Sequence, residues 1–199
     1  MPTSTFFNLP PPKRERLLRA AVEEFSRKPF GEASINRIVQ KAEISRGSFY
    51  QYFTDKNDLF RYIMGYFGEQ LEKTILSSLD ACEGNLLSAS LALFDQVQGY
   101  IQKNHCEFQT LLKILRQNAG LDACQLWNVT GVSQTVLERA DLSQLNIHGA
   151  EEQFALLQLL FTSATHELMA VSRGKSTLEE SRSRLACKIE IIRRGAAMK

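Results

Sequence analysis

The chain has 199 residues, of which 44% are hydrophobic and 23% are charged. This composition is typical of a globular protein with a core, and it excludes collagen-like, coiled-coil-only and wholly disordered classes. The 24 basic and 22 acidic residues nearly cancel, but residues 1–56 hold ten of the basic residues and only six of the acidic ones. A basic N-terminal segment on a mildly acidic remainder indicates a nucleic acid or another anionic surface as partner.

The sequence gives little sign of export, membrane insertion or metal binding. Residues 1–12 lack the basic start and apolar stretch of a secretory signal, and the longest apolar run, 153–166, is too short to span a bilayer. The four cysteines form no CxxC pair and have no histidine at ligand spacing. We therefore expect a cytoplasmic protein with reduced thiols, without a metal or cofactor and without a membrane partner.

The first 53 residues predict three short helices. The first follows a run of three prolines, carries one apolar stripe and ends at Pro29. Ser34 is a suitable N-cap for the second helix, and Ser45 is a suitable N-cap for the third. In the third helix Phe49 and Phe53 lie one turn apart, so both are expected to face inward.

The rest of the chain also predicts helices, because apolar residues recur at spacings of three and four and no strand pattern is found. A long connecting helix is expected to begin at Asp55. The further predicted helices span 85–103, 106–117, 122–140, 150–172 and 177–194. The last of them begins with a capping box formed by Thr177 and Glu180.

The predicted helix 150–172 has apolar residues on more than one face, so it must be buried on more than one side. A second subunit would cover one of these sides, and the final helix would supply the rest of the contact. The residues expected in this homodimer interface are Phe154, Leu157, Phe161, Leu168, Leu185, Ile189 and Ile192. The alternative is a central core helix of a monomer.

The second and third helices, with the turn 42–45 between them, have the spacing of a helix-turn-helix unit. In such a unit the last helix lies in the major groove, where each base pair presents a distinct pattern of donors and acceptors. With Phe49 and Phe53 turned inward, the other faces carry a guanidinium, an amide and several hydroxyl groups. These groups can bond to bases and phosphates.

The segment 44–59, ISRGSFYQYFTDKNDL, resembles the signature of the TetR/AcrR family of bacterial transcriptional regulators. Residues of the first two helices match it as well, so the resemblance covers about the first 60 residues. It implies an all-α fold. Residues 1–54 would form a three-helix helix-turn-helix DNA-binding domain, and residues 55–199 would form a larger helical bundle for effector binding and dimerisation.

The resemblance also implies roles for individual residues. Ser34, Tyr50 and Lys56 would contact phosphates. The residues expected to face bases or backbone are Arg46, Ser48, Gln51 and Tyr52. Ser45, which caps the recognition helix, and Gly47 complete the expected DNA-binding residues, and the amide of Gly47 can approach a phosphate because no side chain stands in the way.

Two positions depart from the family pattern. Glu43 stands where family members usually have glycine, in the turn before the recognition helix. A left-handed backbone there would cost glutamate on the order of 1 kcal/mol relative to glycine, and its charge would sit near DNA. The glycine expected near the end of the first helix is displaced by Lys28, Pro29 and Phe30.

The function expected from these features is that of a homodimeric repressor that binds a palindromic operator in double-stranded DNA and is released by a small apolar or mixed ligand. The alternative is a TetR-like protein without a small effector, which acts through a protein partner or in chromosome organisation. Phe94, Phe108 and Trp127 lie on helices that could enclose a ligand, although isolated aromatics at helical spacing are usually core residues. No nucleophile, base and orienting group form a recognisable set, so we expect no enzyme.

Overall fold

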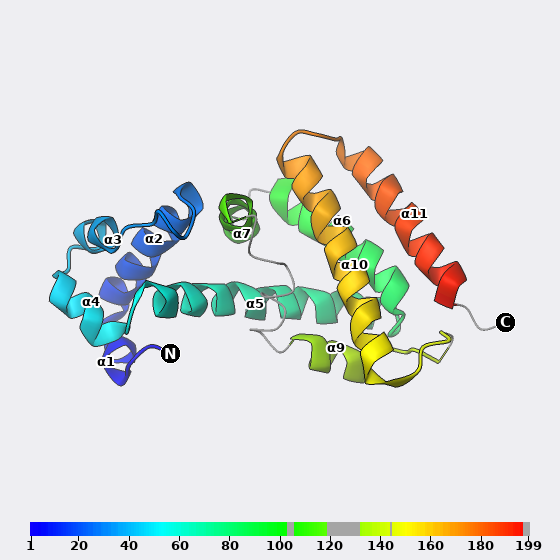
Figure 1. Ribbon diagram of the computed structural model, residues 1–199, viewed down its shortest axis with the longest axis horizontal. Helices are drawn as coiled ribbons and strands as arrows, with labels where there is room; N and C mark the ends of the chain where they lie inside the picture. Colours follow the sequence, from blue (N-terminus) through cyan, green and yellow to red (C-terminus); the bar gives the residue numbers. More distant parts are fainter. Residues whose placement is uncertain (103–105, 119–131, 144, 197–199) are drawn as a thin grey trace. The chain divides into compact units, whose positions relative to one another are not determined.

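The computed structural model describes residues 1–102, 106–118, 132–143 and 145–196 (Figure 1). Its helices are α1 (Ser4–Phe7), α2 (Pro11–Arg27), α3 (Ile35–Ala42), α4 (Arg46–Tyr52), α5 (Lys56–Ala81), α6 (Leu86–Gln102), α7 (Cys106–Gln117), α9 (Val132–Arg139), α10 (Gly149–Ser172) and α11 (Leu178–Ala196). These residues include no β-strand, and an isolated β-bridge joins Asn85 and Asp141. The expected all-α fold is confirmed.

Most helices begin and end within two residues of their predicted bounds, and α7 matches its prediction at both ends. The capping box of α11 is confirmed, because the Thr177 amide donates to Glu180 at 2.9 Å and the Glu180 amide donates to the Thr177 hydroxyl at 3.2 Å. Of the helix predicted over 122–140, α9 is the described part, and residues 122–131 lie outside the described residues.

Helix α1 was not predicted from the sequence. Its four residues are too few to show a helical period, and tertiary contacts hold it in place. The Phe6 side chain is fully buried, and its ring lies 4.8 Å from that of Phe53 and 5.2 Å from that of Tyr62. The Thr3 amide donates to the carbonyl of Tyr52 at 3.0 Å, so the N-terminal residues pack on the end of α4.

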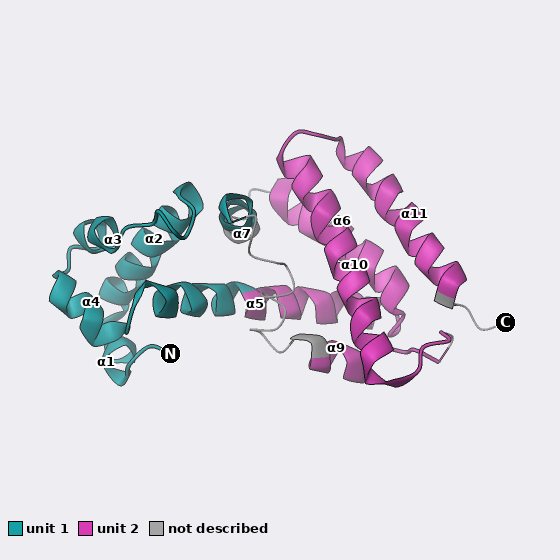
Figure 2. Cartoon of the chain, in the orientation of Figure 1, with its two compact units in different colours: residues 1–67, 109–121 teal, residues 68–108, 122–199 magenta. Residues whose placement is uncertain are grey.

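The chain divides into two compact units (Figure 2). Unit 1 holds residues 1–67 and 109–121, and unit 2 holds residues 68–108 and 122–199. The division therefore falls inside α5, whereas the sequence placed a domain boundary at 54. The first turns of α5 group with unit 1 because they supply core residues there, such as Phe60, whose ring lies 4.9 Å from that of Phe25.

The core of unit 1 forms where α2, α3 and α4 meet the first turns of α5. Aromatic and aliphatic side chains at helical spacing fill it, and the fully buried ones include Leu17, Phe25, Ile38, Phe49 and Phe53. Burial of each such side chain contributes about 1.5–3 kcal/mol. This packing fixes which face of α4 remains outside.

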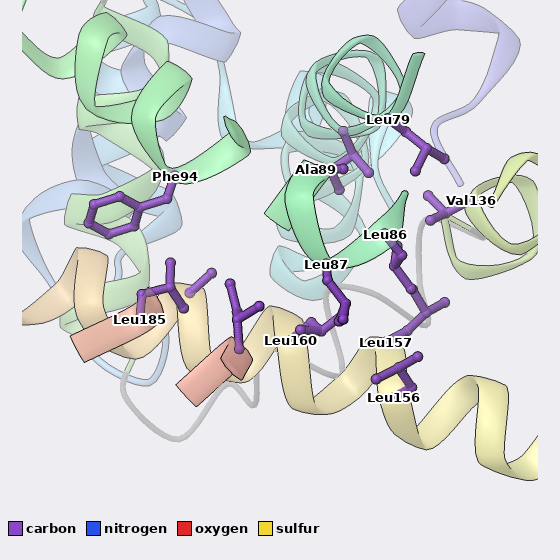
Figure 3. Packing of buried hydrophobic residues seen from close by; sticks show 13 residues of the cluster. Leu79, Leu86, Leu87, Ala89, Phe94, Val136, Leu156, Leu157, Leu160 and Leu185 are labelled. Carbon is purple, nitrogen blue, oxygen red and sulfur yellow. The ribbon is translucent and has the colours of Figure 1, made fainter. Parts of the chain in front are cut away.

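In unit 2, α10 packs against both α6 and α11 (Figure 1). The buried cluster between them includes Leu86, Phe94, Leu157 and Leu185, and Val136 of α9 joins it (Figure 3). Leu157, Leu185 and Ile189 expose 2%, 0% and 8% of their surface within a single chain. This burial contradicts the expectation that these three residues meet a second subunit, because they already form the subunit's own core.

Ion pairs also join α10 to α11. The Glu167 side chain of α10 is fully buried, and its carboxylate accepts from Lys188 at 2.6 Å and from Arg184 at 3.0 Å. Burial alone would raise the pKa of Glu167, but the hydrogen bonds from these two cations outweigh it and lower the pKa to about 2. Glu167 is therefore ionised at neutral pH and fixes the register of the two helices.

Helix α10 is long and apolar enough to cross a bilayer by length and composition, and it is the one described helix for which this holds. The apolar run 153–166 considered above understates its length, since the helix has 24 residues. Helices α6 and α11 cover part of its surface, while Leu159 remains 56% exposed. This pattern matches the predicted helix with more than one apolar face.

Candidate nucleic-acid interface

Helix α4 is fixed from inside and capped at its start, as predicted. The Ser45 hydroxyl accepts from the Ser48 amide at 2.9 Å. Because Phe49 and Phe53 are fully buried, the opposite face of α4 lies outside. Ser45, Arg46, Gly47, Tyr50 and Gln51 are exposed there.

Two of the predicted DNA-contacting residues, Tyr52 and Ser48, are less exposed to solvent. Tyr52 is only 4% exposed, so the structure contradicts its expected place on the outer face of α4. Its position follows from the three-residue step back to buried Phe49, which puts both side chains on one face of the helix. Ser48 is half-buried, and its hydroxyl lies 2.8 Å from that of Ser45.

Arg46 is held by two polar neighbours on the outer surface. Its guanidinium donates to the side-chain oxygen of Asn36 on α3 at 2.5 Å and to the Tyr50 hydroxyl at 3.2 Å. No acidic side chain of the described residues pairs with it. Asn36 had not been singled out from the sequence, although its place in the first turn of α3 puts it near the groove-facing side of a helix-turn-helix unit.

The turn before α4 has the left-handed backbone that the family's usual glycine would favour. Glu43 adopts φ 55° and ψ 46° at the C-cap of α3. Its carboxylate accepts from Arg16 of α2 at 2.6 Å. The charge expected near DNA is therefore paired with Arg16 within unit 1.

The start of α3 is organised by a buried carboxylate. Ser34 occupies the N-cap position, but its side chain makes no capping hydrogen bond. Instead, Glu24 of α2 accepts from the Ser34 amide at 2.9 Å and from the Arg37 side chain at 3.0 Å. The Ser34 hydroxyl is therefore not committed to the cap and is half-exposed.

Lys56 lies in a different setting from the one the resemblance implies. Its ammonium donates to the carbonyls of Phe30, Gly31 and Ala33 at 2.6, 3.3 and 2.9 Å. An ammonium has three N–H donors, so these three acceptors use all of them. In this structure Lys56 binds the turn between α2 and α3, which leaves it no donor for a phosphate.

Five of the ten basic residues of the N-terminal segment are paired internally. Arg16, Arg27, Lys28, Arg37 and Lys41 each lie within ion-pair distance of a glutamate of unit 1. These glutamates are already included in the net charge of residues 1–56, so the pairs do not change that charge but engage half of its cations within unit 1. Arg46 stands out as a cation on the outer face of α4 without an acidic partner.

The expected ligand-contacting residues receive no support. Phe94 is fully buried in the unit 2 core and is not among the residues that line the cavity found there. The side chain of Phe108 and all of Trp127 lie outside the described residues. The cavity has a volume of about 30 Å³ and an apolar lining that includes Leu79, Leu86 and Leu160. Among the described residues, no three His, Cys, Asp or Glu side chains are grouped so that they could hold a metal ion.

Comparison with known proteins agrees with this arrangement. Residues 17–63 match the family model described as bacterial regulatory proteins, tetR family. Over 103 residues the chain is 35% identical to the uncharacterized HTH-type transcriptional regulator YvdT of Bacillus subtilis, a match that covers 52% of this chain and 41% of that relative. Over 76 residues it is 32% identical to the fatty acid metabolism regulator protein of the same species, covering 36% of this chain and 39% of that relative. These matches span less than half the length of either relative.

Solved structures match over more of the chain. A TetR family transcriptional regulator from Chloroflexus aurantiacus is 25% identical, with both chains fully covered and a TM-score of 0.56. A TetR family regulator from Marinobacter aquaeolei is 17% identical, with 94% of this chain and 96% of that chain covered and a TM-score of 0.61, and this likeness concerns the fold. Residues 17–63 therefore form the helix-turn-helix DNA-binding domain of the tetR family of bacterial regulatory proteins, and the chain as a whole is similar to a solved TetR family transcriptional regulator.

Proposed function

We propose that the protein is a homodimeric transcriptional repressor that binds a palindromic operator with the outer faces of two α4 helices. The observation that carries this proposal is the outer face of α4 itself. Arg46, without an acidic partner, and Gln51 are both exposed on α4, and both types of side chain can make paired hydrogen bonds to base edges. Tyr50 and Ser45 add hydroxyl groups at the edge of the same face, where phosphates would lie.

The DNA contacts proposed for each residue follow from exposure. Arg46 and Gln51 would read bases, while Tyr50, Ser34, Ser45 and the amide of Gly47 would bond to phosphates. Ser48, half-buried beside Ser45, would reach the backbone. Tyr52 and Lys56 are left out of the contacting set because their side chains are engaged inside unit 1.

A selection experiment tests the proposal. The purified protein is incubated with a pool of random-sequence duplexes, and the bound fraction is sequenced over several rounds. We expect enrichment of a two-fold symmetric site with half-sites about 34 Å apart, or a multiple of that spacing. The Gln51→Ala variant should shift the preferred base at one position of each half-site and keep the symmetry. Enrichment of no sequence above the starting pool would contradict the proposal.

Dimerisation through α10 and α11 is supported by the apolar side chains that these helices expose to solvent. Leu159 of α10 and Ile191 of α11 are large aliphatic side chains that are 56% and 63% exposed, and they lie on two helices that pack against each other. Phe154 adds a further exposed edge at 37%. A second copy of the chain would cover these groups by bringing the same two helices against its own.

The lining and volume of the unit 2 cavity indicate what kind of effector it could bind. Its lining is apolar apart from Ser90, whose hydroxyl donates to the Leu86 carbonyl at 2.8 Å. A volume of about 30 Å³ is close to that of a single water molecule, while sites for small molecules measure roughly 300–1,000 Å³. An effector entering here would be apolar and would have to separate α5, α6, α9 and α10. Such a ligand would release DNA only if it preferred the conformation that binds DNA poorly.

The proposed setting is the cytoplasm, where the operator lies, and no enzymatic activity is proposed. A thermal-shift screen with apolar compounds tests the effector. A compound that raises the melting temperature and weakens operator binding would support a ligand-released repressor. Screening that yields no such compound, with operator binding intact, would favour the alternative in which a protein partner or DNA occupancy alone sets the regulation.

A further inference from the structure

The turn between α2 and α3 decides where the helix-turn-helix unit begins. Residues 29–33 reverse the chain after α2, and the Glu32 and Ala33 amides donate back to the Pro29 carbonyl at 2.9 and 3.0 Å. Ser34 follows at once as the N-cap of α3. A shift of this turn would therefore move the start of α3, and with it Asn36, which holds Arg46.

Lys56 holds this turn from the start of α5. Its three hydrogen bonds to the carbonyls of Phe30, Gly31 and Ala33 span most of the turn. The ammonium also lies 4.7 Å from the centre of the Phe30 ring, within the range of a cation–π contact. A cation is unfavourable at the N-terminal end of a helix, and the three carbonyl oxygens offset this cost for the Lys56 ammonium at the start of α5.

Asn118 holds the same turn from another part of the sequence. Its side-chain oxygen accepts from the Phe30 amide at 2.6 Å, and its side-chain nitrogen donates to the Ile114 carbonyl at 2.8 Å. Asn118 follows the last residue of α7, belongs to unit 1 and is only 8% exposed. The Phe30 ring packs on Phe60 at 5.1 Å and stacks on Phe25 at 6.2 Å.

Phe30 is thus fixed at its amide, its carbonyl and its ring by three separate elements. The Phe30 amide is partly buried, and an amide removed from water that loses its acceptor carries a desolvation penalty, so removing the Asn118 oxygen would favour a displaced turn. Removing the Lys56 ammonium would release three carbonyls at once. Both losses act on the turn, and neither replaces a side chain on the outer face of α4.

We propose that Lys56 and Asn118 are positioning residues for DNA recognition, which act by clamping the turn 29–33 and do not contact DNA themselves. The inference rests on the proposed DNA-binding function. It replaces the phosphate contact that the family resemblance implies for Lys56, and it assigns a role in DNA binding to a residue far from the helix-turn-helix segment in sequence.

The salt dependence of binding separates the two roles of Lys56. A lysine that pairs with a phosphate contributes about 0.9 to the slope of log K against log salt concentration, so its removal would reduce the slope by about that amount for each protomer. A positioning lysine contributes affinity without a released counterion. The Asn118 side chain is uncharged and gives the reference behaviour for a clamp residue.

The experiment uses the full chain with Lys56→Met, Asn118→Leu and Asn118→Asp, and with Lys73→Met as the matched control on the exposed side of α5. Operator binding is measured by fluorescence anisotropy at four salt concentrations, and melting curves identify any variant that fails to fold. Hydrogen exchange at the Phe30 amide is followed in the free protein. Asn118→Asp keeps an acceptor oxygen and serves as the conservative variant.

We expect Lys56→Met and Asn118→Leu each to weaken operator binding by about tenfold with an unchanged salt slope, and Asn118→Leu to speed exchange at Phe30. Asn118→Asp should recover part of both effects, and Lys73→Met should match the wild type. A slope reduced by about one per protomer in Lys56→Met, or unchanged Phe30 exchange in Asn118→Leu, would overturn the proposal. If the wild type bound no duplex, the proposed function would fail, while Phe30 exchange would still show whether the clamp exists.

Discussion

The Arg16 guanidinium of α2 lies 2.6 Å from the carboxylate of Glu43, the residue whose left-handed backbone joins α3 to α4. The pair ties α2 to the turn of the helix-turn-helix segment. It also explains how a glutamate is accommodated where the family usually has glycine, since the side chain gains a partner on α2. Both side chains are substantially exposed, so the pair contributes at most about 1 kcal/mol.

Replacement of Glu43 separates backbone strain from the ion pair. Glu43→Gln keeps the strained backbone and loses the charge, so the free energy of unfolding should fall by about 0.5 kcal/mol. Glu43→Gly also loses the ion pair but relieves the left-handed strain. We expect the glycine variant to be more stable than the glutamine variant by about 1 kcal/mol in urea unfolding. A glycine variant less stable than the glutamine variant would contradict the assigned backbone conformation.

Gly47 offers a way to separate stability from DNA binding. A Cβ atom at this position would meet only the Ser45 hydroxyl, at the ordinary contact distance of 3.8 Å, so the protein itself does not require glycine there. Because alanine is favoured over glycine in a helix, Gly47→Ala should leave the melting temperature unchanged or raise it. If a phosphate approaches the Gly47 amide, the same variant should bind operator at least about fivefold more weakly. Unchanged affinity would remove Gly47 from the proposed contacts.

Acid should weaken the packing of α10 on α11 through Glu167. Its folded pKa is lowered to about 2 from an ordinary value of 4.5, so its contribution to stability is complete above pH 4.5 and is lost as the pH falls from 4.5 towards 2. Glu167→Gln should lower the free energy of unfolding at pH 7 by about 2 kcal/mol, because it leaves two cations without their buried partner. It should also flatten the pH dependence of stability between pH 4.5 and 2. An unaltered acid profile in this variant would show that Glu167 is not the titrating group.

The proposed dimer contact is tested at the exposed apolar side chains. Leu159→Lys and Ile191→Lys place a charge on the surfaces of α10 and α11 that a partner would cover, and neither side chain belongs to the unit 2 core. Sedimentation at micromolar concentration should show a dimer for the wild type and a shift to monomer for both variants. Ser88→Lys, an exposed substitution on α6, should remain dimeric. A wild-type monomer, or variants that dimerise like the wild type, would contradict this assignment.

The sequence predicted the helices well because buried aromatic and aliphatic residues recur at helical spacing, as in α4, where Phe49 anchors the inner face. It did not predict α1, which is held by contacts of Phe6 with residues distant in the sequence. Some residues have a different role in the structure from the one that the sequence indicated. Lys56 has the place of a phosphate-binding lysine, yet it donates to three carbonyls of a turn that precedes it by more than twenty residues.

Contacts across the chain account for the other differences. Asn118 lies after α7, and nothing in its local sequence indicates that it accepts from Phe30. The apolar positions of α10 and α11 showed that these helices are buried on several sides, but they did not show which side meets the chain's own core. Leu157 and Leu185 face that core, while Leu159 and Ile191 stay outside.

The central claim is that the outer face of α4 reads DNA, and Arg46 tests it most directly. Operator affinity is measured by fluorescence anisotropy for the wild type and Arg46→Ala, with the duplex enriched by selection and a scrambled duplex of equal length. We expect the wild type to prefer the selected duplex by at least about a thousandfold. Loss of a guanidinium contact to bases in each half-site should weaken binding of Arg46→Ala to that duplex by at least about thirtyfold. Equal binding of the two duplexes by the wild type, or wild-type affinity in Arg46→Ala, would contradict the claim.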